Sequence, residues 1–68
     1  MSMGKPAVPE LIKLLANDDA QVRWYAIDAL GRIGTAASEA VPALKEAAED
    51  EDESVRKNAA WALFQIEP

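Results

Sequence analysis

The chain contains one unit of sequence twice. Residues 7–34, AVPELIKLLANDDAQVRWYAIDALGRIG, align without a gap on residues 40–67, AVPALKEAAEDEDESVRKNAAWALFQIE, at an offset of 33. Eleven of the 28 aligned pairs are identical, and they are Ala7/Ala40, Val8/Val41, Pro9/Pro42, Leu11/Leu44, Asp19/Asp52, Val22/Val55, Arg23/Arg56, Ala26/Ala59, Ala29/Ala62, Leu30/Leu63 and Ile33/Ile66. A repeat with a period of about 20 to 50 residues indicates a stacked array, because one unit alone cannot bury its apolar face.

The length of the chain limits how stable such an array can be. A core built from 68 residues supplies only about 3 to 5 kcal/mol. The chain has no cysteine for a disulfide and no histidine, which excludes a zinc site built from cysteine and histidine. Stability must therefore come from regular helix packing or from association with another chain. The absence of cysteine fits a reducing compartment, and we expect a cytoplasmic location.

The charge of the chain is unevenly distributed. The net charge is −5, and four basic residues balance four acidic residues in the first half. The second half has three basic residues, Lys45, Arg56 and Lys57, against eight acidic ones. An acidic body repels phosphate backbones, so we expect no nucleic-acid binding. No apolar run reaches the roughly 18 residues of a membrane span, so we expect no membrane contact either.

Helical spacing of apolar residues predicts two helices in the first unit. The first runs from Pro6 to Ala16, and residues 1–5 before it are expected to form a disordered leader. The second runs from Ala20 to Ile33, where Gly34 provides a C-terminal stop. Asp19 is placed to cap this second helix, and the short turn before it predicts a helical hairpin.

The second unit predicts the same two helices. Thr35 or Ser38 is expected to cap its first helix, in which Val41, Leu44, Ala47 and Ala48 face inward. A bend or a short leading turn is expected near Pro42. Its second helix is expected at residues 53–66, with Asp52 as the cap of its N-terminus.

The two units resemble HEAT repeats, specifically the short bacterial HEAT-like type also found in phycobilin lyases. The family pattern is close to AVPALxxLLxDxDxxVRxxAAxALGxIG, which the first unit follows nearly throughout. The second unit departs from it at Ala47 and Ala48, which replace larger apolar residues, and at its ending Phe64-Gln65-Ile66-Glu67.

The resemblance implies an all-α fold, a four-helix, two-repeat fragment of an α-solenoid. It covers residues 6–67 as a single domain, with repeat one at about residues 6–34 and repeat two at about residues 35–67. The hairpins stack with a right-handed twist, and their second helices line the concave face. It also implies structural roles for Arg23 and Arg56, which reach acids in the hairpin turns such as Asp50 or Asp52.

Large apolar residues are predicted on the side of the second helices that faces away from the core. At about 100° per residue, Phe64 lies about 180° and Trp61 about 240° from Val55. The same count places Trp24 and Ile27 on the corresponding side of the first unit. Exposed apolar patches mark contact sites, and two units are fewer than a solenoid normally needs. We therefore expect a homodimer that buries this aromatic surface, whose predicted members are Trp24, Tyr25, Ile27, Asp28, Lys57, Trp61 and Phe64.

Several alternatives remain open at this level. The aromatic residues can pack on one another within the chain, or hold a helix or extended peptide of another protein. The chain can be a segment of a longer array, natural or designed. The resemblance also allows an accessory subunit of an enzyme that holds a chromophore or protein, and some HEAT-like proteins bind nucleic acid.

No catalytic or metal-binding motif is recognisable. Asp50, Asp52 and Ser54 have the opening spacing of a calcium loop, but Val55 and Trp61 stand where that loop needs Gly and Glu. Without histidine, no hydroxyl has its common activating base. We expect neither catalysis nor a cofactor.

Overall fold

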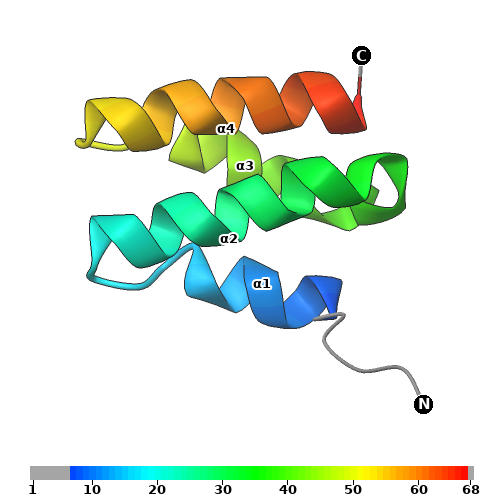
Figure 1. Cartoon of the computed structure of the whole chain (residues 1–68), viewed down its shortest axis with the longest axis horizontal. Coiled ribbons are helices and arrows are strands. Elements are labelled where there is room, and N and C mark those ends of the chain that lie inside the picture. Colours follow the sequence, from blue (N-terminus) through cyan, green and yellow to red (C-terminus); the bar gives the residue numbers. More distant parts are fainter. Residues whose placement is uncertain (1–6, 68) are drawn as a thin grey trace.

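The structure, a computed structural model, describes residues 7–67, and these are helical or in turns (Figure 1). Its elements are α1 (Val8–Leu14), α2 (Ala20–Ile33), the 3₁₀ helix η1 (Gly34–Ala40), α3 (Val41–Ala47) and α4 (Glu53–Ile66). The all-α prediction is confirmed, and so are the bounds of the two long helices. The predicted first helix was too long, because α1 ends at Leu14 rather than Ala16. The expected leader lies outside the described residues.

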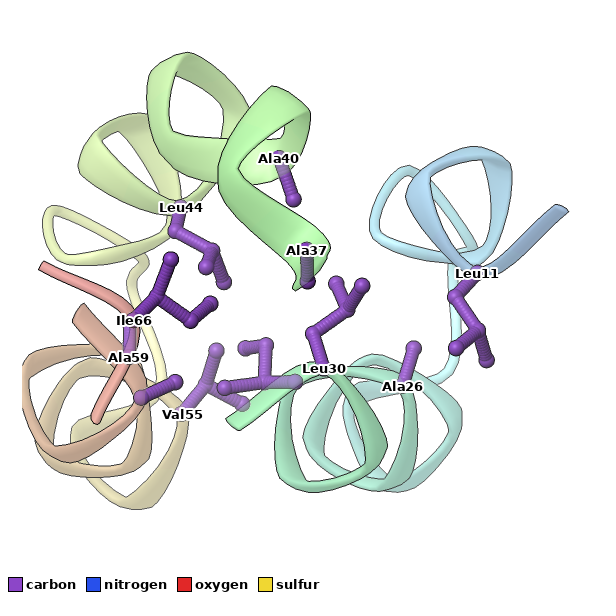
Figure 2. Close-up of a cluster of buried hydrophobic side chains, with 11 residues drawn as sticks. Leu11, Ala26, Leu30, Ala37, Ala40, Leu44, Val55, Ala59 and Ile66 are labelled. Atoms are coloured by element: carbon purple, nitrogen blue, oxygen red, sulfur yellow. The ribbon is translucent and has the colours of Figure 1, made fainter. Parts of the chain in front are cut away.

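The helices form two layers. Figure 2, seen along the helices, shows α2 and α4 side by side, with η1 and α3 above the groove between them and α1 against α2. The Cα trace measures 38 × 27 × 15 Å. The shortest extent accommodates no more than two layers, since packed helices are about 8 to 10 Å apart. The outer face of α2 and α4 is therefore uncovered in the single chain.

The core lies between the layers and is small. Its buried members are Leu11, Ala26, Ile27, Leu30, Ala37, Ala40, Leu44, Val55, Ala59, Ala62 and Ile66. Figure 2 shows Leu30, Leu44 and Ile66 pointing into the space enclosed by α2, α4 and η1. Five of the eleven buried residues are alanine, so close helix approach rather than side-chain volume fills this core.

Both predicted aspartate caps are confirmed. The Asp19 carboxylate accepts a hydrogen bond from the backbone N–H of Gln21 at 2.9 Å. Asp52 accepts from the backbone N–H groups of Ser54 at 2.9 Å and Val55 at 3.2 Å. These bonds satisfy N–H groups that the first helical turn leaves without a partner.

The predicted cap of the third helix is wrong. Thr35 and Ser38 both lie within η1, and neither η1 nor α3 has a side-chain cap. Gly34 ends α2 with φ 77°, a conformation that favours glycine, and the chain then continues directly as a 3₁₀ turn. The 3₁₀ turn leaves no extended residue in which a cap could form, and it buries Ala37 and Ala40 instead. It is also the short leading turn expected before Pro42.

An arginine network links the two hairpin turns. Arg23 forms a bidentate pair with Asp50, through Nε to Oδ2 at 2.9 Å and Nη2 to Oδ1 at 3.1 Å. Its Nη1 also donates to the carbonyl oxygens of Asn17 and Asp18 at 2.8 and 3.0 Å. Arg23 therefore closes its own turn and binds the next unit, as predicted. Arg56 donates to the carbonyls of Asp50 and Glu51 rather than to an acid.

Hydrogen bonds from the backbone of Asp52 and from Arg23 lower the pKa of the Asp50 carboxyl. The backbone N–H of Asp52 donates to it at 2.9 Å and is the largest cause, followed by the hydrogen bond from Arg23. The two paired side chains are only 12% and 13% exposed, so water screens the pair less than it screens surface pairs. A depressed native pKa stabilises the fold above the unfolded pKa of about 3.9.

We predict that Asp50→Asn lowers the free energy of unfolding by about 1 to 2 kcal/mol at pH 7. The amide keeps an acceptor for the Asp52 N–H, as Asn17 does for Asp19, while the charge partner of Arg23 is lost. As the pH falls from about 4 toward the lowered native pKa of Asp50, the wild type should lose this part of its free energy of unfolding. The variant lacks the carboxylate, so the difference between the two proteins should shrink. Urea unfolding followed by circular dichroism at pH 7 and pH 3 measures this, and equal wild-type-to-variant gaps at both pH values would contradict it.

Candidate functional site

The largest exposed apolar side chains lie on the two long helices. Among the described residues, Tyr25 is 61% exposed, Trp61 40% and Phe64 66%, and all three belong to α2 or α4. Leu14 on α1, at 40%, is the other large exposed hydrophobic residue. We call the surface made by Trp24, Tyr25, Trp61 and Phe64 the aromatic face. It is the candidate site, because exposed aromatic residues are over-represented among contact anchors.

Trp61 lies across the seam between α4 and α2. A Cβ atom placed on Gly31 would come within 2.4 Å of Cζ3 of the Trp61 ring. The benzene half of the indole therefore rests on the backbone of α2, which only glycine permits. The sequence analysis placed Trp61 on the side of the helix that faces away from the core. Trp61 is 40% exposed, and its ring packs on α2 rather than pointing only into solvent.

Trp24 and Tyr25 form a second aromatic group. Their rings make an edge-to-face pair with centroids 5.5 Å apart. Trp24 is partly buried against the core, and its carbonyl oxygen accepts a hydrogen bond from Nδ2 of Asn58 at 3.0 Å. Together with Asp52 and Ser54 of the second unit, the pair lines a shallow hollow between the N-terminal ends of α2 and α4.

Ile27 is not part of this surface, contrary to the sequence prediction. It is 0% exposed and belongs to the core. The angular count, taken with Val22 at zero, assumed a single buried stripe, but α2 has neighbours on two sides. Contact with α4 widens its buried arc, so Ile27, Leu30 and Gly31 are all covered.

The two predicted charged residues of the surface pair within their own helices. The carboxylate of Asp28 accepts from Nε of Arg32 at 2.8 Å, and Nζ of Lys57 lies 3.4 Å from Oε2 of Glu53. Both are pairs four residues apart on a helix, which contribute about 0.3 to 0.5 kcal/mol each. They leave these charges at the rim of the aromatic face.

The described residues offer little else for chemistry. They hold no group of three or more Asp, Glu, Cys or His side chains arranged for a metal ion. None of the described helices is long and apolar enough to cross a bilayer.

We predict opposite effects of Gly31→Ala in two backgrounds. Alanine in a helix is normally about 1 kcal/mol more stable than glycine. In the wild type the new Cβ collides with the Trp61 ring, so the substitution should destabilise the chain. In a Trp61→Ala background the collision is absent, and the same change should stabilise it by up to about 1 kcal/mol. Thermal unfolding of the four variants measures the coupling, and additive effects would show that the ring does not rest on Gly31.

The family comparison agrees with this architecture. A sequence model of the family described as HEAT repeats matches residues 6–67. No curated protein and no solved structure matches the chain. With two stacked helical hairpins and a family match over nearly all its length, the chain belongs to the HEAT repeat family.

Proposed function

We propose that this chain is a non-enzymatic protein-binding module that associates with a second copy of itself through its aromatic face. The observation that carries the proposal is the exposure of Tyr25, Trp61 and Phe64 on one layer of a two-layer stack. HEAT repeats generally mediate protein–protein interaction or scaffolding, which fits a contact surface.

The aromatic face provides enough apolar area to drive association. An aromatic side chain buries about 150 to 250 Å². Tyr25 and Phe64 each expose more than half of theirs. At about 25 cal/mol per Å², covering the exposed part of one such ring contributes about 2 to 4 kcal/mol. Several rings together can offset the entropic cost of bringing two molecules together.

The fold itself favours a companion. Two units are fewer than the three or more that normally make an independent solenoid. The buried core contains only six side chains larger than alanine. A second copy that binds exposed apolar side chains of this layer adds buried apolar surface to the small core, so association and stability are expected to rise together.

The charge distribution favours a protein partner over a nucleic acid. The net charge is −5, and in the described structure Arg23, Arg32 and Lys57 are paired with acids. An acidic chain repels the phosphate backbone of a nucleic acid.

We predict that the wild-type chain forms dimers at about micromolar concentration and that Tyr25→Ser combined with Phe64→Ser weakens the dimer at least about tenfold. Both side chains are exposed, so helicity should be retained. Leu14→Ser removes an exposed hydrophobic residue from the other layer and serves as the matched control, with dimerisation unchanged. Sedimentation equilibrium measures this. A wild type that stays monomeric over the whole range would contradict the proposal.

A further inference from the structure

The second unit leaves exposed the positions that the first unit buries. On α2, Arg23, Ile27, Leu30 and Gly31 are covered or nearly covered by unit two. An offset of 33 carries these positions to Arg56, Ala60, Leu63 and Phe64 on α4, of which Leu63 is half-buried and the others are exposed. We call these four residues and the exposed Glu67 the C-terminal edge. In Figure 1, α4 lies at the upper border of the molecule with no described element beyond it.

We infer that a second copy of the chain binds at the C-terminal edge, with the two α4 helices packed antiparallel about a two-fold axis. This rests on the proposed self-association and specifies its geometry: the contact is centred on the edge of α4, and Phe64 is the residue that edge and aromatic face share.

Continued head-to-tail stacking is disfavoured by the residues at the other end of the chain. Where unit one contacts unit two, Arg23 pairs with Asp50, and the ring of Trp61 packs on the backbone at Gly31. The first unit has Asn17 where the second has Asp50, and Asp28 where the second has Trp61. A copy stacked head to tail would therefore set Arg56 against a neutral amide and Phe64 against a carboxylate. Phe64 would also fill the space that Gly31 leaves open for an indole.

A two-fold contact instead pairs complementary charges. Arg56 lies four residues before Ala60, and Glu67 lies four residues after Leu63. When Ala60 of one copy faces Leu63 of the other, each Arg56 comes opposite Glu67 of the second copy. The small alanine side chain allows the helices to approach to about 8 Å.

The two charged residues are suited to this pairing. In the described residues, Arg56 uses only Nη1, whereas Arg23 also binds a carboxylate through Nε and Nη2. Glu67 caps the C-terminus of α4, where the helix dipole disfavours an anion, and the last turn has no basic side chain. Arg56 of the second copy would supply the missing cation.

A charge-reversal series tests the geometry. Arg56→Glu and Glu67→Arg should each weaken the dimer about tenfold, and the combined reversal should restore most of the affinity. Glu67→Arg leaves the hairpin turn intact, so its effect does not depend on the fold tolerating loss of the Arg56 turn contacts. Arg32→Glu, on the exposed rim of α2, is the control for Arg56→Glu, because it makes the same change in net charge.

A cross-link provides the second measurement, since the chain has no cysteine. Ala60→Cys should be captured as a covalent dimer by a short thiol cross-linker, whereas Gln21→Cys on α2 should not. The two-fold edge contact would be overturned if neither charge reversal changed the dimer affinity and Ala60→Cys cross-linked no better than Gln21→Cys. The proposed function would stand in that case. A monomeric wild type would overturn both.

Discussion

The packing of α2 against α4 is the contact that joins the two units, and three interactions hold it along its length. Arg23 pairs with Asp50 at the turn end, Asn58 donates to the carbonyl of Trp24, and Trp61 rests on the backbone at Gly31. Each interaction pairs one unit with the other rather than closing a unit on itself. These interactions therefore link the two hairpins to each other, as expected for a stacked repeat.

The packing of α2 against α4 also explains which surface of the chain remains uncovered. The two long helices, α2 and α4, form one layer, and α1, η1 and α3 cover only one side of that layer. Five of the eleven core residues are alanine, so the helices approach closely and the core between the layers is small. The rings of Tyr25 and Phe64 are consequently left at the surface, and that of Trp61 is half covered.

Local features could be predicted from the sequence because their causes are local. The two aspartate caps, the glycine stop and the bounds of α2 and α4 depend on residues within a few positions of one another. The Arg23 contact with Asp50 followed from the resemblance to HEAT repeats. Three features could not be predicted from local sequence. They are the burial of Ile27, the 3₁₀ turn that contains Thr35 and Ser38, and the packing of Trp61 on Gly31. The burial of Ile27 and the contact of Trp61 with Gly31 depend on how α2 lies against α4, which a count along a single helix does not contain. The 3₁₀ turn follows from the way the chain continues directly after Gly34.

Small-angle X-ray scattering over a concentration series tests the central claim most directly, because the flat shape of the chain makes the two possible dimers distinct. An edge contact continues the row of helices, so the dimer should keep the 15 Å Cα thickness while the 27 Å dimension roughly doubles. Scattering from a compact particle of doubled thickness would show that the faces, and not the edges, meet. Scattering that remains monomeric at every concentration would contradict the account as a whole.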